Sequence, residues 1–389
     1  MITHDELLEI LMSWSFFGDT ILPKTVARQL HLPTQLAPDL ALIIQGVRRG
    51  GKSTLLTQLP QHYGLNLEHC YFCNFEDPRL LGYLDHTLLT HIVKLAKSRD
   101  PHAPCYFFFD EIQHVSGWEK WLHTQFERPQ NNYFVLSGSN SALLSGELAS
   151  ALTGRHMTVE LYPFSFHEYL EVYPKGTIYD YLKMGGFPKA LFYADREKLL
   201  QEYFNDIVLR DILQRVSARS SDGIKQVAKM AFESCGSELS FRKIAAVTHL
   251  SVETVQHYLE ACEQAYLLFT CQFFAFSEKK RLSQHKKFYP IDPALHQAVT
   301  TKIGENWGKH LEILVFLSLK KRYQNVYYWR SSHSEVDFVV LEGKLIRPYQ
   351  VTWGPLQDRH RTALDEFYQI FPEAAEFVLI NQDNAAQFV

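Results

Sequence analysis

A glycine-rich segment near residue 50 carries the clearest chemical pattern in the chain. Its letters, GVRRGGKST, match the spacing G-x-x-x-x-G-K-[ST] at Gly46, Gly51, Lys52 and Ser53. Small residues are needed here because the backbone must curl around phosphates and point successive N–H groups at them, while the following helix presents its positive end. The segment therefore predicts a loop that holds the phosphates of a nucleotide.

The side chains of this loop have distinct expected roles. Lys52 would neutralise the β- and γ-phosphates of ATP, and the Ser53 hydroxyl would ligate Mg²⁺. Of the two arginines in the loop, one is expected to face solvent. The predicted nucleotide-binding residues are Gly46, Val47, Arg48, Arg49, Gly50, Gly51, Lys52, Ser53 and Thr54.

Hydrolysis needs two further groups, and the segment CYFFFDEIQ offers both. Asp110 ends an apolar, strand-like run, where its carboxylate would hold the hydration shell of Mg²⁺. Glu111 follows as the candidate base for the attacking water. Two acids that merely end a buried strand are the plainer alternative, and the glycine-rich loop upstream favours the catalytic interpretation.

Polar residues after the fourth strand-like run and an arginine before the fifth complete the predicted nucleotide site. Ser139 and Asn140, in YFVLSGSN, are placed to hydrogen-bond a γ-phosphate or the attacking water, although a plain turn would use the same residues. Arg155, in LTGR, is expected to reach phosphate within its own subunit or across an interface as an arginine finger. A surface salt bridge is the alternative for Arg155.

Short apolar runs separated by helical patterns indicate the scaffold. The predicted strands are Leu40–Gln45, His69–Phe75, Cys105–Asp110, Tyr133–Ser137 and Met157–Leu161, preceded by a helix over Glu6–Phe17. Strands that alternate with helices imply a parallel, three-layer α/β sheet. Cys70 and Cys73 fall on one of these strands, so we expect two core cysteines on opposite faces instead of half a zinc site.

Composition limits the class of protein. A chain of 389 residues with 46% hydrophobic and 21% charged residues is typical of a folded protein with two or three domains. The six irregularly spaced cysteines do not form a disulfide pattern, and we see neither a signal-like start nor a membrane-spanning run. We therefore expect a cytoplasmic protein. A formal net charge of −4 restricts any contact with nucleic acid to a local basic patch.

Four parts are predicted along the chain: a nucleotide-binding core over residues 1–162, a helical lid over 163–222, a winged helix-turn-helix over 223–294 and a final α/β module over 295–389. The helix-turn-helix expectation depends on FRKIAAVTHLSVETVQHYLEAC, in which Ser251 would cap the second helix. A basic tract follows where a β-hairpin wing would contact DNA phosphates. The tract consists of Lys279, Lys280, Arg281, Lys286 and Lys287.

Taken in order, GVRRGGKST, NFEDPRLL, FFFDEIQ, LSGSN, LLSGELASALTGR, LYPFSFHEYL and GGFPKAL resemble a prokaryotic AAA-type P-loop ATPase family whose C-terminal region is DUF4143-like. The resemblance covers nearly the whole chain. It implies an AAA-like core with a helical lid, then a winged helix and a restriction-endonuclease-like fold. It also implies the nucleotide and Mg²⁺ roles given above for Lys52, Ser53, Asp110 and Glu111, and it matches Ser139 or Asn140 to a polar sensor segment.

The final module departs from the endonuclease pattern that it resembles. Glu312 and Asp337 match acids that hold a metal, but Gln350 stands in the second acid position and Thr352 stands where a lysine is expected. Glutamine still offers a neutral oxygen to Mg²⁺, whereas threonine supplies no positive charge for the transition state. The sequence therefore predicts a nuclease fold without efficient nuclease activity.

Three functions remain open from the sequence. The leading hypothesis is an ATPase whose nucleotide state, ATP or ADP, changes how its C-terminal domains engage double-stranded DNA or a protein partner. The second is a nucleotide-gated switch that turns over little ATP and signals through a homo-oligomer and a protein partner. An ATP-dependent nuclease is the third, and Thr352 speaks against it.

Overall fold

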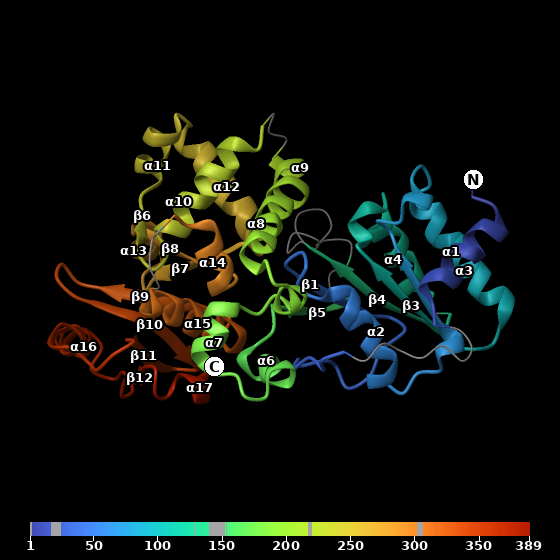
Figure 1. The fold of residues 1–389 in the computed structure, drawn as a ribbon. Helices are drawn as coiled ribbons and strands as arrows, with labels where there is room; N and C mark the ends of the chain where they lie inside the picture. Colours follow the sequence, from blue (N-terminus) through green and yellow to red (C-terminus); the bar gives the residue numbers. More distant parts are fainter. Residues whose placement is uncertain are drawn as a thin grey trace. The chain divides into compact units, whose positions relative to one another are not determined.

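A computed structural model describes residues 2–16, 25–128, 130–139, 152, 154–216, 220–301 and 306–389. The chain forms two compact units, Met1–Tyr162 and Pro163–Val389 (Figure 1). Among the described residues, no helix is both long enough and apolar enough to cross a membrane.

The first unit is built on a five-stranded sheet with the order β2-β3-β4-β1-β5, in which every pair is parallel. Its strands are β1 (Ala41–Gly46), β2 (Cys70–Asn74), β3 (Cys105–Asp110), β4 (Asn132–Gly138) and β5 (His156–Leu161). Its helices include α1 (His4–Trp14), α2 (Lys52–His62), α3 (His86–Arg99) and α4 (Trp118–Glu127). Each predicted strand is confirmed to within one residue at either end, because each is a short apolar run between polar segments.

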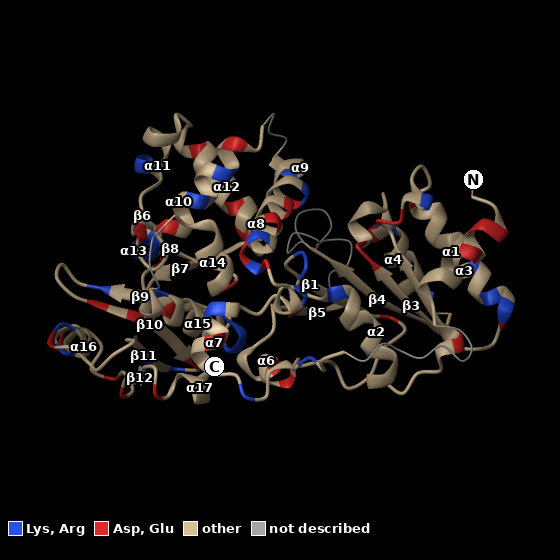
Figure 2. Ribbon diagram, in the orientation of Figure 1, with Lys and Arg blue, Asp and Glu red and all other residues tan. Residues whose placement is uncertain are grey.

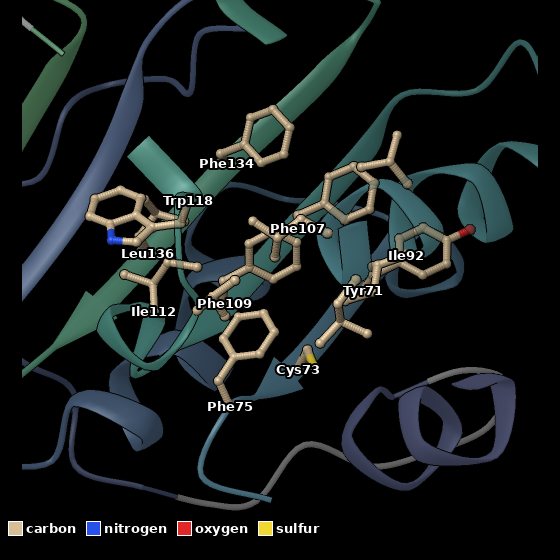
Figure 3. Packing of buried hydrophobic residues seen from close by; sticks show 14 of the residues in the cluster. Tyr71, Cys73, Phe75, Ile92, Phe107, Phe109, Ile112, Trp118, Phe134 and Leu136 are labelled. Carbon is tan, nitrogen blue, oxygen red and sulfur yellow. The ribbon is translucent and has the colours of Figure 1, made fainter. Parts of the chain in front are cut away.

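Side chains alternate between the two faces of this sheet, so strands β1 to β4 each contribute to two separate cores. One core contains Phe107, Phe109 and Phe134 with residues from α1, α3 and α4, and Figure 3 shows these rings packed together. The opposite core lies between the sheet and α2. Cys73 belongs to the first core and Cys70 to the second, which confirms that the two cysteines point to opposite faces.

Helix α1 is fastened to edge strand β2 at its C-terminal end. The Ser15 hydroxyl accepts a hydrogen bond from the Phe72 backbone N–H at 3.0 Å. The indole N–H of Trp14 donates to Asp77 Oδ2 at 2.8 Å, and the Arg79 guanidinium donates to the same carboxylate. Hydrogen bonds from Arg79, from its backbone N–H and from Trp14 outweigh the effect of burial and lower the pKa of Asp77 to about 2.

Replacing Asp77 with alanine is expected to loosen helix α1. Losing charge-assisted hydrogen bonds of this kind costs about 1–3 kcal/mol, so amide exchange over His4–Trp14 should accelerate by roughly 5- to 150-fold. Because folding lowers the pKa of Asp77, its stabilising contribution is complete above about pH 4 and disappears as the pH falls toward 2. Hydrogen-exchange mass spectrometry measures the effect, with exposed Asp39→Ala as the control. Unchanged exchange in α1 would contradict the prediction.

The second unit begins with helical structure and ends in a mixed sheet. Its first elements are α6 (Phe166–Val172), α7 (Ile178–Met184), η5 (Pro188–Phe192), α8 (Arg196–Asp206), the π-helix η6 (Ile207–Ile212) and α9 (Leu213–Val216). Helices α10 (Asp222–Glu233), α11 (Phe241–Thr248) and α12 (Val252–Gln264) follow. Ser251 caps α12 by accepting from the Thr254 N–H at 3.0 Å, which confirms the expected cap of this helix.

A seven-stranded sheet with the order β12-β11-β10-β9-β7-β8-β6 joins the remaining elements. The strands are β6 (Glu238–Leu239), β7 (Leu268–Phe273), β8 (Lys286–Pro290), β9 (Val326–Arg330), β10 (Glu335–Glu342), β11 (Leu345–Val351) and β12 (Val378–Ile380). The helices are α13 (Glu278–Ser283), α14 (Pro293–Val299), α15 (Trp307–Arg322), α16 (Asp358–Ile370) and α17 (Ala385–Phe388). Because β7 pairs with β9, strands from either side of the expected boundary at residue 294 share one sheet.

The basic tract lies in and beside the antiparallel pair of β7 and β8, and its first three residues are helical instead of part of a strand. Lys279, Lys280 and Arg281 lie on helix α13, which connects β7 to β8, and the Arg281 guanidinium donates to the Tyr327 hydroxyl at 3.1 Å. Lys287 lies on β8 and is fully buried, where its ammonium group pairs with Glu335. The expectation that Lys287 contacts DNA is therefore wrong, because pairing with an acid from β10 draws this lysine into the interior.

Candidate functional site

The glycine-rich loop of the first unit runs from the end of β1 to the start of α2. A Cβ atom on Gly46 would lie 2.1 Å from the Leu161 carbonyl oxygen, so this position has no room for a side chain. Gly51 precedes the helix with φ at 100°, in the left-handed region that favours glycine. These two glycines let the backbone turn sharply and aim the N-terminus of α2 into the loop, which is the arrangement that binds phosphate.

The Lys52 side chain lies against the backbone of the glycine-rich loop. Its ammonium group donates to the carbonyl oxygens of Gly46 and Val47, at 3.0 and 3.2 Å, and lies 3.6 Å from Glu111 Oε1. Only 4% of the residue is exposed. An incoming triphosphate would replace neutral carbonyl oxygens with charged phosphate oxygens as partners of this ammonium group, which strengthens the hydrogen bonds.

The carboxyl ends of adjacent strands β3, β4 and β1 bring the predicted acids to the loop. The Ser137 hydroxyl, near the end of β4, donates to Asp110 Oδ1 and accepts from the Glu111 backbone N–H at 3.2 Å. Glu111 adopts a left-handed backbone with φ at 55°, which is rare for a residue with a side chain and is found at functional sites. This turn directs its carboxylate toward Lys52.

The two acids have different electrostatic surroundings. Burial and the neighbouring Glu111 carboxylate raise the pKa of Asp110, although the Ser137 and Ser53 hydroxyls and Lys52 oppose that rise. For Glu111, burial raises the pKa, but Lys52, Gln113 and Arg48 outweigh it and hold the pKa below the ordinary value. Glu111 is therefore ionised at neutral pH, as a base must be. A divalent cation beside Asp110 would offset its desolvation, so the oxygens of Ser53 and Asp110 fit Mg²⁺.

The other predicted site residues differ in their positions relative to the nucleotide loop. The Ser139 backbone N–H donates to Glu111 Oε2 at 3.2 Å, so this residue belongs to the site through its main chain. Asn140 lies outside the described residues. Of the loop arginines, Arg48 is buried and pairs with Glu76 at 2.8 Å, while Arg49 is exposed, as expected of one of them.

The structure does not bring Arg155 to the nucleotide loop of its own chain. Arg155 directly precedes β5, and His156 pairs with Ala41 at the start of β1, whereas the loop follows Gly46 at the end of β1. With a rise of about 3.3 Å per residue, the strand separates the two positions by roughly 16 Å. The sequence could not show this, because the parallel pairing of β1 with β5 determines which end of the sheet Arg155 occupies.

Sequence reasoning missed three polar groups beside the loop. The Gln113 side-chain amide donates to Glu111 Oε2 at 2.5 Å, and His114 Nε2 lies 3.7 Å from Glu76 Oε1. Arg28 donates to the Gly50 and Tyr162 carbonyl oxygens at 3.1 and 2.6 Å. The positions of Gln113 and His114, two and three residues after Glu111, were the only available signal for the first two. Arg28 is remote in sequence from the loop and gave none.

In the second unit, the residues matched to the endonuclease pattern do converge. Asp337 on β10 accepts from the Gln350 side-chain amide at 2.5 Å and from the Val351 backbone N–H at 2.8 Å. Glu312 on α15 accepts from Lys309 and from Tyr289, at 2.9 and 2.8 Å. Burial and the neighbouring Glu312 carboxylate raise the pKa of Asp337. Thr352 lines the same cavity as these acids.

Comparison with known families and proteins agrees with a nucleotide site in the first unit. A family model described as an AAA domain matches residues 39–170, and two described as domains of unknown function, DUF8612 and DUF4143, match residues 175–306 and 307–388. An uncharacterized protein of Haemophilus influenzae is 31% identical over 83% of this chain and 85% of its own length. Uncharacterized protein MJ1544 of Methanocaldococcus jannaschii is 32% identical over 82% and 75%.

Two solved structures show weaker likeness. The structure of C. elegans PCH-2 aligns with a TM-score of 0.25 and 12% identity, over 58% of this chain and 61% of its own, so the chain spans less than two thirds of that protein. A structure of Drosophila ORC bound to AT-rich DNA and Cdc6 gives a TM-score of 0.21 and 10% identity, over 67% and 84%. The family models and the two relatives show that this chain belongs to the prokaryotic family that joins an AAA-type P-loop domain to a C-terminal DUF4143 region.

Proposed function

We propose that the first unit binds ATP with Mg²⁺ and hydrolyses it, and that nucleotide state controls how the second unit engages DNA or a protein partner. The observation that carries the proposal is the convergence of Lys52 and Glu111, 3.6 Å apart, at the carboxyl ends of the parallel strands β1 and β3, which flank β4. In this arrangement Lys52 binds the β- and γ-phosphates, while Ser53 and Asp110 hold the cation. Glu111, kept ionised by Lys52, takes a proton from the attacking water.

Steady-state ATP turnover tests this function directly. It is measured with the protein alone and with double-stranded or single-stranded DNA, at several salt concentrations. Stimulation by DNA that falls with added salt supports phosphate contacts by the second unit. Turnover that DNA leaves unchanged favours a protein partner. In the predicted helix-turn-helix, the charged residues of α11 are only Lys and Arg and those of α12 only Glu, and Figure 2 shows both colours in this part of the second unit.

One feature of the site favours the second candidate function, a nucleotide-gated switch with little turnover. Glu111 Oε2 accepts hydrogen bonds from the Gln113 side chain and from the Ser139 backbone N–H, and the Gln113 bond lowers the pKa of the carboxylate that must take a proton from water, which makes it a weaker base. A switch of this kind retains ATP through purification and changes oligomeric state on nucleotide exchange. Nucleotide content by chromatography and size by light scattering distinguish it from a steady ATPase.

Arg155 lies far from the nucleotide loop of its own chain. The role to test is therefore that of an arginine finger acting across a subunit interface. If Arg155 acts on the nucleotide of a neighbouring copy, Arg155→Ala and Lys52→Met should each be inactive alone. Mixing them should restore part of the turnover, because one supplies an intact loop and the other an intact arginine. An arginine finger contributes about 10³- to 10⁵-fold to turnover, so restored activity is easily measured. No recovery on mixing, or full activity of Arg155→Ala alone, would contradict this role.

A further inference from the structure

Gln113 lies beside the candidate base on a short 3₁₀ turn. Helix η3 (Ile112–His114) follows Glu111 directly, and the His114 backbone N–H donates to the Glu111 carbonyl oxygen at 3.2 Å. Ile112 anchors the turn, because its side chain is buried and packs in the hydrophobic core shown in Figure 3. The turn therefore folds the Gln113 side chain back toward the carboxylate that precedes it.

The amide of Gln113 has a protein partner for its nitrogen but none for its oxygen. The nitrogen donates to Glu111 Oε2 at 2.5 Å. The oxygen, Oε1, is buried, and no donor among the described residues reaches it. A buried amide oxygen without a donor is costly, and such an atom in a native protein indicates a bound water molecule or ligand. One amide carries both atoms, so this free acceptor lies beside the carboxylate of the candidate base.

The ionisation of Glu111 decides which way this amide points. Burial raises the pKa of Glu111. Lys52, Gln113 and Arg48 together outweigh burial and hold that pKa below its ordinary value, and the effects of Lys52 and Arg48 do not depend on the amide's orientation. Glu111 Oε2 therefore carries no proton at neutral pH. Turning the amide over would set its oxygen against an ionised acceptor, so the nitrogen faces Glu111 and the oxygen stays free.

The two oxygens of the Glu111 carboxylate have different partners. Oε2 accepts from the Gln113 amide and from the Ser139 backbone N–H, at 2.5 and 3.2 Å. Oε1 faces the Lys52 ammonium group at 3.6 Å, which is too long for a hydrogen bond. Each carboxylate oxygen accepts about two hydrogen bonds, so Oε1 keeps a position for a water molecule. A water molecule that donates there has a second hydrogen, and Gln113 Oε1 is an acceptor that needs one.

We propose that Gln113 is a catalytic residue that orients the attacking water: its Oε1 atom accepts one hydrogen of the water while the Glu111 carboxylate accepts the other. The inference rests on the ATP hydrolysis proposed above and adds a second acceptor to it. With both hydrogens held, a lone pair of the water oxygen is free for the γ-phosphorus. A glutamine suits this task, because its neutral amide oxygen accepts a hydrogen bond without competing for the proton.

The step needs no reactant besides ATP and water. Glu111 takes one proton of the water, and the water oxygen forms a bond to the γ-phosphorus. The bond from that phosphorus to the oxygen that bridges to the β-phosphate breaks, and its electron pair leaves with ADP. The second proton stays on the new inorganic phosphate, hydrogen-bonded to Gln113 Oε1. Glu111 then releases its proton to solvent.

Two plainer roles for Gln113 give different results on substitution. If the amide only weakened Glu111 as a base, removing it would raise turnover. If the amide only positioned Glu111, any other donor at residue 113 would serve. A residue that orients water needs the acceptor as well, so turnover falls whenever Gln113 Oε1 is lost.

Gln113→Met and Gln113→Lys separate these roles. Methionine keeps the size of the side chain and removes both polar atoms, whereas lysine keeps a donor for Glu111 and removes the acceptor. We expect kcat to fall roughly 100-fold in each variant, with unchanged affinity for a non-hydrolysable ATP analogue and Mg²⁺. Single-turnover rates measure the chemical step, and calorimetry measures the affinity. Gln130→Met, which replaces an exposed glutamine of the first unit, is the matched control and should keep wild-type turnover.

The outcomes separate this role of Gln113 from the ATPase function itself. A wild type that turns over no ATP overturns both. If the wild type turns over ATP, equal or faster turnover in Gln113→Met, or wild-type turnover in Gln113→Lys, overturns the role of Gln113 Oε1 alone. A loss of analogue affinity that matches the loss of kcat would assign Gln113 to nucleotide binding and also overturn it. Thermal unfolding profiles like that of the wild type show that the variants are folded.

Discussion

Replacing Glu111 with glutamine is expected to lower kcat for ATP hydrolysis by about 10²- to 10⁴-fold, the usual contribution of a positioned general base. ATP binding should survive, because glutamine keeps the shape of the side chain and Lys52 keeps its charge. The variant should therefore accumulate bound ATP. Turnover by phosphate release and affinity by calorimetry together separate loss of chemistry from loss of binding.

The same residue makes a prediction about pH. Burial alone would raise the pKa of Glu111, yet Lys52, Gln113 and Arg48 keep it below its ordinary value. Turnover should therefore show no acid limb from this residue between about pH 5 and 8, since the carboxylate is ionised throughout that range. Glu127→Gln, an exposed substitution at the end of α4, is the matched control. Wild-type turnover in Glu111→Gln would exclude Glu111 as the base.

Replacing Lys52 with methionine should weaken ATP binding by about 100-fold or more and abolish measurable turnover. Each hydrogen bond to a charged group contributes about 1.5–3 kcal/mol, and two phosphates lose their shared ammonium donor. Methionine keeps most of the apolar stem, so the packing of this residue, which is 4% exposed, changes little. Calorimetric titration with ATP and Mg²⁺ measures the effect.

Lys94→Met provides the matched control for Lys52→Met. Lys94 is an exposed lysine on α3 and should tolerate the same substitution without a change in ATP affinity. A thermal unfolding profile like that of the wild type shows that the loop variant remains folded. Undiminished ATP affinity in a folded Lys52→Met variant would contradict the phosphate-binding role of the loop and the function proposed for the first unit.

The local sequence was enough to predict the nucleotide loop and the strands around it. The loop is contiguous, so the spacing of Gly46, Gly51 and Lys52 already contains its geometry. Asp110 was found for a similar reason, because a carboxylate at the carboxyl end of a parallel strand must lie at the same edge as the loop. Local patterns also placed the Ser251 cap and the opposite directions of Cys70 and Cys73.

Features that depend on pairing between distant segments became visible only in the folded chain. The pairing of β1 with β5 carries Arg155 to the far end of the sheet, and the pairing of Lys287 with Glu335 buries a lysine that the sequence had assigned to the surface. Similarly, Gln350 lies next to Asp337 only because β10 pairs with β11. Strand register and buried charge pairing join residues far apart in the chain, and no spacing rule along the sequence records which partners they choose.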